Sequence, residues 1–572
     1  MTDKIIKKDE INLVFAAEAG QGSDTISTIL AKVFKDAGYN IFSTKEAMSR
    51  IRGGANSNDL RVSSSKICAG VWNIDVLIPL SANALDHVKD RISDNTLIFG
   101  EKEFISTRYC QKCKVRAVNF SGIAKEIGGI IYTNTVAAGF IMGLMNLDTI
   151  YLEELLKKRF AKKSEDIVNK NIEAAKRGYE KGKEFCKNEN ISIEIKRDET
   201  IKDQIIINGS TAVGMGCIAG GCNYVSSYPM SPSTGVLIFL AANGKEFDII
   251  VEQAEDEIAA INMTLGAWYA GARGLATTSG GGYALMKEGI SLAGMIETPV
   301  VIHLAQRPGP ATGLPTRTEQ GDLELALYAG HGEFPRVLYA PGDLQQAFYL
   351  SQKAFNIADK YQVPVTILTD QYILDSSYNV EEFDMSELSV DKYIIETNEN
   401  YKRYEYTENG ITPRGIPGFG KGLVGLDSDE HDEEGHITEN LNTRVKMVDK
   451  RLKKYEALND DIIPPELIGP ENYKTLLLAW GTNLNIVKEA MQKLNKDDLA
   501  FLHYSQVWPL HPDTIKYLEK AEKVIMIENN ATSQFAKLIR QQTGFTIQDK
   551  ILKYNGHAFY VEELVEKISD LI

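Results

Sequence analysis

The sequence lacks a long hydrophobic run. None of its 572 residues falls in a stretch of about 18 consecutive apolar positions, which a membrane-spanning helix requires. The opening segment MTDKIIKKDE also lacks the apolar core of a secretory signal. We therefore expect no membrane partner and a cytoplasmic location.

Positive charge is in deficit as well. The chain has 63 Lys and Arg against 78 Asp and Glu, a net charge of −15. This balance argues against nucleic acid as a partner, because nucleic-acid binding depends on basic surface. An apolar content of 43% is enough for several cores. The length predicts about three to four domains.

Cysteine is scarce and dispersed. The six cysteines are Cys68, Cys110, Cys113, Cys186, Cys217 and Cys222. Reduced thiols are the default in a chain of this kind. Cys110 and Cys113 form one C-x-x-C pair, for which incidental thiols, a redox pair and metal ligands remain open. Without a four-cysteine cluster, the chain is not expected to store electrons on iron and sulfur.

The glycine-rich loop near the start is incomplete. Gly20 and Gly22 follow the predicted strand INLVFAAEA and precede a predicted helix, so they could cradle a phosphate at the helix N-terminus. Thr25 occupies the position of the third glycine in a dinucleotide fingerprint. NAD binding and a purely structural turn both remain alternatives for this loop.

The remaining pattern is that of an α/β protein. Strands and helices alternate in a way that predicts three doubly wound α/β domains. The expected boundaries are 1–190, 204–385 and 471–572, with an extended connector over 386–470. A highly charged segment over about 150–203 is predicted to be a solvated linker helix. In the connector, His431, Asp432, Glu433, Glu434 and His436 fit either a metal site or a solvated turn.

Three segments in the second block carry candidate chemistry. Tyr228-Pro-Met-Ser-Pro-Ser233 follows a predicted strand, and its two prolines make a rigid elbow that presents the Ser231 hydroxyl. Glu257 opens the apolar part of a helix, where a carboxylate needs a partner if it is buried. A strand over 300–305 is followed by Arg307 and by a Gly/Pro loop with Thr312.

In order and spacing, these segments resemble the 2-oxoacid:ferredoxin oxidoreductases. The match is to the α subunit fused behind a γ domain, and its most specific part is QRPGPATGLPTRTEQ over 306–320. The resemblance implies thiamine diphosphate between two subunits. The α subunit would hold the aminopyrimidine ring, and a β subunit would hold the diphosphate and Mg²⁺.

The resemblance also implies roles for individual residues. Glu257 matches the glutamate that hydrogen-bonds the aminopyrimidine and drives its acid–base chemistry. Arg307 matches the arginine that binds the 2-oxoacid carboxylate, a contact suited to a planar guanidinium. The substrate-site residues Ser231, Thr312 and Tyr228 lie in matching motifs, although Ser231 replaces the family's threonine and Met230 its isoleucine.

The first block is similar to the family's γ domain. Its segment over 50–54 matches an Arg-Gly-Gly element, so Arg52, Gly20 and Gly22 are candidates for binding or gating coenzyme A. Glu18 and Ala19 replace two glycines of the family's usual loop. The His-Asp-Glu stretch of the connector also has a counterpart in the family, which favours a structural role for it.

A Gly-Asp-Gly element that could start a diphosphate site is absent before Asn529 and Asn530. The chain should therefore hold half a thiamine site and require a β subunit that also carries a [4Fe-4S] cluster. Ferredoxin as acceptor and a dimer of αβ pairs are further expectations. The expected reaction is oxidative decarboxylation with coenzyme A. 2-Oxoglutarate is favoured, and pyruvate, branched-chain 2-oxoacids, a transketolase-like transferase, an indolepyruvate-type enzyme and a nucleotide-binding scaffold are alternatives.

Overall fold

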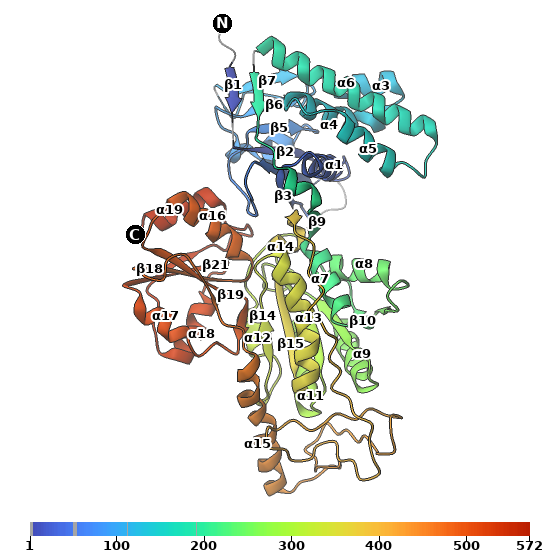
Figure 1. The fold of residues 1–572 in the computed structure, drawn as a ribbon, viewed down its shortest axis with the longest axis vertical. Coiled ribbons are helices and arrows are strands. Elements are labelled where there is room, and N and C mark those ends of the chain that lie inside the picture. The colour runs from blue at the N-terminus through green and yellow to red at the C-terminus, as the bar shows by residue number, and fades with distance from the viewer. Residues whose placement is uncertain (1–3, 8, 50–53, 111, 190) are drawn as a thin grey trace. The chain divides into compact units, whose positions relative to one another are not determined.

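The computed structural model describes residues 4–7, 9–49, 54–110, 112–189 and 191–572. The chain divides into two compact units (Figure 1). The first runs to Ile207 and takes in Asp375–Glu382 and Tyr560–Glu563; the second comprises Asn208–Leu374, Phe383–Phe559 and Leu564–Ile572. Both are built from helices and sheets with parallel strands, so the predicted α/β class is confirmed.

The first unit contains an eight-stranded sheet in the order β7-β6-β5-β2-β4-β3-β16-β9. Strands β2, β5, β6 and β7 run parallel, whereas β4 pairs antiparallel with both β2 and β3. The strands are β2 (Glu10–Glu18), β3 (Asn40–Glu46), β4 (Ala55–Ser63), β5 (Val76–Pro79), β6 (Leu97–Gly100), β7 (Lys114–Ala117), β9 (Ile205–Asn208) and β16 (Ser377–Val380). A separate parallel pair joins β1 (Lys4–Lys7) to β8 (Ile191–Glu194).

Strand β4 was not expected, because its sequence ANSNDLRVS is polar. It is nevertheless buried, because its charged side chains are paired with groups of other segments. Arg91 forms a two-point contact with Asp59, and Arg61 bonds the carbonyl of Ala69 and the carboxylate of Glu10. Alternating hydrophobicity therefore fails to identify a strand whose polar groups are paired inside the fold.

Helices cover this sheet, and two of them pack unusually closely. The helices are α1 (Ser23–Asp36), α2 (Ala84–His87), α3 (Phe120–Ile127), α4 (Thr133–Leu144), α5 (Ile150–Arg159) and α6 (Glu165–Glu189). A Cβ atom at Gly178 or Gly182 of α6 would lie within 2.3 Å of a backbone carbonyl oxygen of α4. The prediction of a solvated linker helix is therefore wrong for α6. Its small residues bury one face against α4, and its charges occupy the remaining faces.

The second unit is built on a seven-stranded sheet in the order β11-β10-β12-β13-β15-β14-β20. All neighbours are parallel except β20, which pairs antiparallel with β14. The strands are β10 (Tyr224–Ser227), β11 (Ile250–Gln253), β12 (Gly274–Thr278), β13 (Val300–Gln306), β14 (Val337–Tyr339), β15 (Pro364–Asp370) and β20 (Gln506–Trp508). The chain adds β11 on one side of β10 and β12 on the other, so the winding reverses there. Open α/β sheets bind ligands at the carboxyl ends of strands at such a reversal.

Nine α-helices connect and flank these strands in the described chain from 209 to 458. They are α7 (Gly209–Ala219), α8 (Thr234–Asn243), α9 (Glu257–Tyr269), α10 (Gly280–Leu285), α11 (Lys287–Met295), α12 (Leu323–Leu327), α13 (Leu344–Tyr361), α14 (Gln371–Asp375) and α15 (Leu441–Leu458). Helices α7 and α13 pack against each other. No helix in the described residues is both long enough and apolar enough to cross a bilayer.

The expected connector is irregular only in part. Residues 383–440 contain only isolated bridges and turns among described elements, but α15 then forms a regular helix. Lys450 and Lys454 of α15 bind the carboxylate of Glu297, at 2.8 and 2.6 Å, and all three side chains are at most 2% exposed. This buried ion cluster fixes α15 to the segment that precedes β13. Figure 1 labels α15 on the ribbon.

A five-stranded sheet completes the second unit, in the order β17-β19-β18-β21-β22. Its strands are β17 (Glu466–Ile468), β18 (Thr475–Trp480), β19 (Leu499–Tyr504), β21 (Lys523–Glu528) and β22 (Asp549–Leu552). Its helices are α16 (Leu484–Leu494), α17 (Thr514–Lys520), α18 (Gln534–Thr543) and α19 (Val561–Ser569).

Candidate functional site

The loops that follow β10, β12 and β13 meet at the carboxyl edge of the seven-stranded sheet. The guanidinium of Arg307, after β13, donates a 2.6 Å hydrogen bond from Nη1 to the carbonyl of Ser231, after β10. The elbow is further fixed by the Ser233 hydroxyl, which donates to the Met230 carbonyl at 2.7 Å. Two of the segments singled out from the sequence are therefore in direct contact.

Glu257 is buried at the first turn of α9 and is only 3% exposed. The preceding Asp256 caps the helix by accepting a 2.8 Å hydrogen bond from the Ala259 amide. Burial raises the pKa of Glu257, with a smaller increase from Asp256. Its Oε1 atom is inaccessible to solvent and has no hydrogen-bond partner among the described residues.

Gly282 of α10 lies against this carboxylate. A Cβ atom at position 282 would lie 2.6 Å from Glu257 Oε1 and 2.1 Å from Thr278 Oγ1. Any larger residue would fill the space beside the unpartnered oxygen. The Ser-Gly-Gly-Gly turn therefore keeps one side of Glu257 open.

Arg307 is half-buried, and burial lowers its pKa against the opposing effect of Asp322. Its Nε is inaccessible to solvent and has no acceptor within the described ranges. The side chains of Ser231 and Thr312 are exposed, and Tyr228 is 41% exposed. The structure thus places the five predicted residues on neighbouring loops and helices, with hydrogen bonding between Arg307 and Ser231.

Asp322 and Ser279 were not singled out from the sequence. Asp322 Oδ2 and Ser279 Oγ are both inaccessible and lack partners in the described chain. A Cβ atom at Gly280 would lie 2.5 Å from Asp322 Oδ2, so Asp322 adjoins the same glycine turn as Glu257. The only signal in the sequence is the proximity of this aspartate to the long Gly/Pro loop.

Burial also shifts the acidic groups of that loop. It raises the pKa of Asp322 to about 6, although Arg307 acts in the opposite direction. The pKa of Glu319 is raised to about 7 by burial and by the negative charge of Asp322. Carboxyl groups that titrate near neutrality are suited to proton exchange during a reaction.

The other end of the loop is anchored to the five-stranded sheet. Gln320 donates to the Trp480 carbonyl at 2.9 Å and accepts a 3.1 Å hydrogen bond from the Asn529 amide. Asn530 donates to the Gln320 carbonyl at 3.2 Å. Asn529 and Asn530 therefore stabilise the loop that carries Arg307 and Asp322.

In the first unit, Gly20 and Gly22 precede α1 with φ values of 89° and 85°. This left-handed conformation favours glycine. A Cβ atom at Gly22 would also lie 2.1 Å from the amide nitrogen of Asn134, so Asn134 fills the space above the turn. Arg52 lies outside the described residues.

The structure joins Cys110 and Cys113 in a disulfide. This pairing corresponds to the redox pair among the alternatives that the sequence left open, and neither sulfur is available as a metal ligand in this form. Cys186, Cys217 and Cys222 are free thiols.

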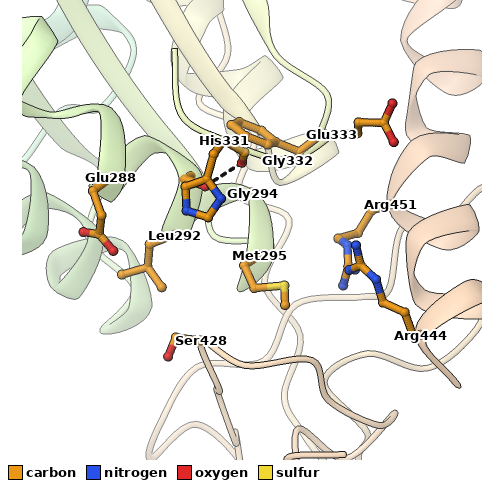
Figure 2. A pocket seen from close by; sticks show the side chains of 12 residues that line it. Glu288, Leu292, Gly294, Met295, His331, Gly332, Glu333, Ser428, Arg444 and Arg451 are labelled. Atoms are coloured by element: carbon orange, nitrogen blue, oxygen red, sulfur yellow. Dashed lines mark hydrogen bonds between the residues drawn. The ribbon is translucent and has the colours of Figure 1, made fainter. Parts of the chain in front are cut away.

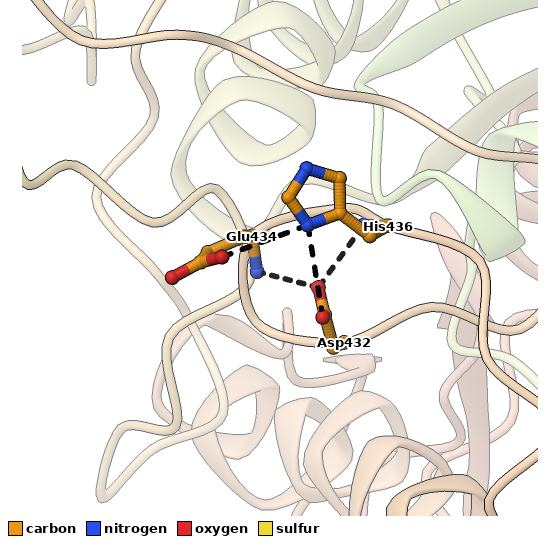
Figure 3. Close-up of side chains that lie close together, drawn as sticks. All are labelled: Asp432, Glu434 and His436. Atoms are coloured by element: carbon orange, nitrogen blue, oxygen red, sulfur yellow. Dashed lines mark hydrogen bonds and ion pairs between the residues drawn. The ribbon is translucent and has the colours of Figure 1, made fainter.

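A cavity and a cluster of ionisable side chains lie away from the sheet edge where the winding reverses. A cavity of about 270 Å³ is lined by His331, Ser428, Arg444, Arg451 and neighbouring residues (Figure 2). Both arginines bind the same carboxylate, Glu430, which compensates one of their two positive charges. Asp432, Glu434 and His436 lie close together on the connector (Figure 3), but Asp432 accepts hydrogen bonds from the turn's own amides, as expected for a solvated turn.

Comparison with known proteins identifies related families. The family described as pyruvate flavodoxin/ferredoxin oxidoreductase, thiamine diphosphate-binding, matches residues 215–450, and the family described as pyruvate ferredoxin/flavodoxin oxidoreductase matches residues 12–181. The 2-oxoacid:ferredoxin oxidoreductase subunit alpha of a Sulfolobus species is 31% identical, over 98% of this chain and 97% of its own length. The 2-oxoglutarate synthase subunit KorA of Archaeoglobus fulgidus is also 31% identical, over 63% of this chain and 97% of its own.

A solved structure agrees with these relatives. The 2-oxoglutarate:ferredoxin oxidoreductase from Magnetococcus marinus, with 2-oxoglutarate, coenzyme A and succinyl-CoA bound, superposes with a TM-score of 0.92 and 30% identity. The match covers 98% of this chain and 99% of that chain. The resemblance found in the sequence motifs is thereby confirmed across nearly the full length, and the chain belongs to the 2-oxoacid:ferredoxin oxidoreductases as an alpha subunit.

Proposed function

We propose that this alpha subunit, together with a β subunit, converts 2-oxoglutarate and coenzyme A into succinyl-CoA, CO₂ and reduced ferredoxin. The main support for this proposal is a set of buried polar atoms without partners near the carboxyl edge of the seven-stranded sheet, where its winding reverses. They are Glu257 Oε1, Ser279 Oγ, Arg307 Nε and Asp322 Oδ2. Buried polar atoms are costly without partners, so such a set indicates a ligand site. The Magnetococcus enzyme supports 2-oxoglutarate as the substrate, with pyruvate and branched-chain 2-oxoacids as alternatives.

Glu257 and the glycine turn fit the aminopyrimidine of thiamine diphosphate. The unpartnered Oε1 provides a buried acceptor, and the absence of a side chain at Gly282 leaves space beside it. When bound, thiamine diphosphate supplies a nucleophilic carbon and accepts the electrons released by decarboxylation. Glu257 holds the proton shared with the ring nitrogen, and its raised pKa suits that exchange.

Arg307 binds the carboxylate that all 2-oxoacids share. Its Nη1 is fixed on the Ser231 carbonyl, which orients the guanidinium and leaves Nε available to a ligand. The Ser231 and Thr312 hydroxyls and the Tyr228 ring line the exposed approach to this position. Charge-assisted hydrogen bonds to a guanidinium are strong and directional, so they suit carboxylate selection.

The remaining assignments concern the partners. The β subunit supplies the diphosphate site with Mg²⁺ and a [4Fe-4S] cluster that passes electrons to ferredoxin. Residues 1–190 act as a γ domain, in which Gly20, Gly22 and Arg52 contribute to binding coenzyme A. Residues 204–385 hold the pyrimidine, 386–470 connect, and 471–572 form a transketolase C-terminal-like domain. The assembly is a cytoplasmic dimer of αβ pairs.

The test is reconstitution. The purified chain, with thiamine diphosphate and Mg²⁺, should not reduce a one-electron dye in the presence of 2-oxoglutarate and coenzyme A. Co-expression with a small subunit that has a Gly-Asp-Gly element and clustered cysteines should give dye reduction that depends on both substrates. Activity of the isolated chain would refute the divided site, and preference for pyruvate would refute the substrate.

A further inference from the structure

Asp322 is held in a confined position beside the proposed carboxylate site. Its amide donates a 3.1 Å hydrogen bond to the Gln306 side chain at the end of β13. Its carboxylate lies against Gly280, where even a Cβ atom would come within 2.5 Å of Oδ2. The backbone is therefore fixed, while one carboxylate oxygen has no hydrogen-bond donor in the described chain.

The Asp322 amide bonds the side chain of Gln306, the residue that directly precedes Arg307, and the charges of Arg307 and Asp322 act on each other's pKa although no salt bridge joins them. Each retains an unpartnered buried atom, Nε on the arginine and Oδ2 on the aspartate. The negative charge of Asp322 therefore acts on Arg307 at a distance, and no hydrogen bond joins the two side chains. A ligand carboxylate at Nε would replace Asp322 in that electrostatic role.

The other ionisable groups near Asp322 come from several elements. Glu319 precedes it on the same loop and is itself raised to a pKa of about 7, so it adds negative charge when ionised. Only burial and Arg307 contribute to the shift of Asp322, whose pKa is about 6. Three further carboxylates lie on adjoining elements. Asp370 on β15 accepts a hydrogen bond from the Ile373 amide, and Glu324 on α12 pairs with Lys537. The third is Glu257 on α9, whose Oε1 has no partner among the described residues.

A bound 2-oxoacid brings a second carboxylate to one guanidinium in a poorly solvated place. Two like charges in one site cannot both remain ionised at low cost, and the more easily protonated group accepts a proton. The carboxyl next to an oxo group is a strong acid, so the proton goes to the protein side chain. The neutral carboxyl can then donate its O–H to the ligand.

We propose that Asp322 takes up one proton when the carboxylate of a 2-oxoacid binds at Arg307, so that oxoacid binding is linked to proton uptake. The step is balanced, because the side chain gains one proton from solvent and no other covalent bond changes. This inference rests on the proposed function, since it takes Arg307 as the carboxylate-binding residue. Asp322 is in this sense a further substrate-binding residue.

The experiment uses the complete complex with its β subunit and thiamine diphosphate. The probe is 2-hydroxyglutarate, which keeps the carboxylate but has no oxo carbon to react. Calorimetric titration at pH 7.5 in phosphate and in Tris counts protons, because the two buffers differ in ionisation heat. We expect close to one proton taken up per site for the wild type and none for Asp322→Asn. Glu324→Gln, a matched carboxylate on α12, should retain the uptake.

The wild type alone provides a second measurement. Linkage makes the probe's Kd rise with pH between the pKa of Asp322 in the free protein and its pKa in the bound protein, by at most about tenfold per pH unit, and we expect this rise between pH 7 and 8.5. Asp322→Asn should show a flat profile in that range. If the variant fails to assemble, the wild-type profile still decides the question.

Three results would overturn the inference. They are a flat wild-type profile, uptake that persists in Asp322→Asn, or uptake that is lost in Glu324→Gln. If the complex turned over 2-oxoglutarate but bound 2-hydroxyglutarate without taking up a proton, this inference would be refuted and the proposed function would stand. A complex without any 2-oxoacid turnover would refute the proposed function, and this inference with it.

Discussion

Replacing Glu257 with Gln should separate catalysis from stability. The carboxylate is 3% exposed, and its Oε1 has no hydrogen-bond partner within the described residues. Its pKa is raised by burial, so the ionised form costs folding free energy at neutral pH. The sign follows from linkage. The folded state binds the proton more tightly than the unfolded state, so stability falls as pH rises above the ordinary value of 4.5.

An uncharged glutamine of the same shape removes this cost. We expect the unfolding temperature of Glu257→Gln at pH 7.5 to equal or exceed that of the wild type, with a smaller difference near pH 4.5. Turnover by the reconstituted complex should fall by on the order of 10²-fold or more, which is the usual contribution of a general acid or base. That loss corresponds to about 2.7 kcal/mol of transition-state stabilisation or more.

The assay is 2-oxoglutarate-dependent dye reduction at saturating thiamine diphosphate, with unfolding followed on the same preparation. Asp256→Asn is the matched control, because it changes the neighbouring carboxylate to a residue that also caps helices. It should leave turnover near normal. If Glu257→Gln kept turnover within about twofold of the wild type, the general acid–base assignment would be wrong.

Three other predictions follow from named contacts. Arg307→Lys should lower kcat/KM by at least about tenfold for both pyruvate and 2-oxoglutarate, since it loses a bidentate donor; a loss confined to one oxoacid would place Arg307 at the substrate side chain. Gly182→Ala should cost about 1–3 kcal/mol, because its Cβ would lie 2.3 Å from the Phe140 carbonyl, whereas Gly266→Ala, with open space around it, should cost nothing. Glu297→Gln should cost about 3–5 kcal/mol at pH 7 by urea unfolding of the second unit. The buried lysine partners lower the pKa of Glu297 well below 4.5, so its contribution to stability is present above pH 4.5 and is lost as pH falls through the folded-state pKa. If the difference in unfolding free energy between Glu297→Gln and the wild type stayed the same at strongly acidic pH, the buried ion pair would not be its cause.

Much of the second unit could be predicted because its local and tertiary signals agree. The runs that form β13 and β15 are rich in apolar residues and buried along their whole length, as is usual for central parallel strands. Strand β4 and helix α6 mislead for the opposite reason. Their charged residues suggest solvent exposure. The fold nevertheless buries β4 by pairing its charges, and it buries one face of α6 by close packing at its glycines.

The candidate site divides in the same way. Arg307 and Ser231 could be placed near each other from motif order, and their 2.6 Å contact agrees with that prediction. Asp322 could not be found this way, because a single aspartate at a helix start is usually a cap. Its position depends on Gly280, which is remote in sequence and whose missing side chain leaves room for the carboxylate.

The glycine turn of α10 explains why these groups coexist. Gly280 faces Asp322, and Gly282 faces Glu257, so one short turn separates two buried carboxylates that each have an unpartnered oxygen. A fold optimised only for stability would pair or expose such groups. Here larger side chains would collide with both, and the long loop is secured at Gln320 rather than at the site itself. The loop is therefore held from outside the site, and the polar atoms inside it keep no protein partners in the described chain, as the proposed binding of a cofactor and a substrate requires.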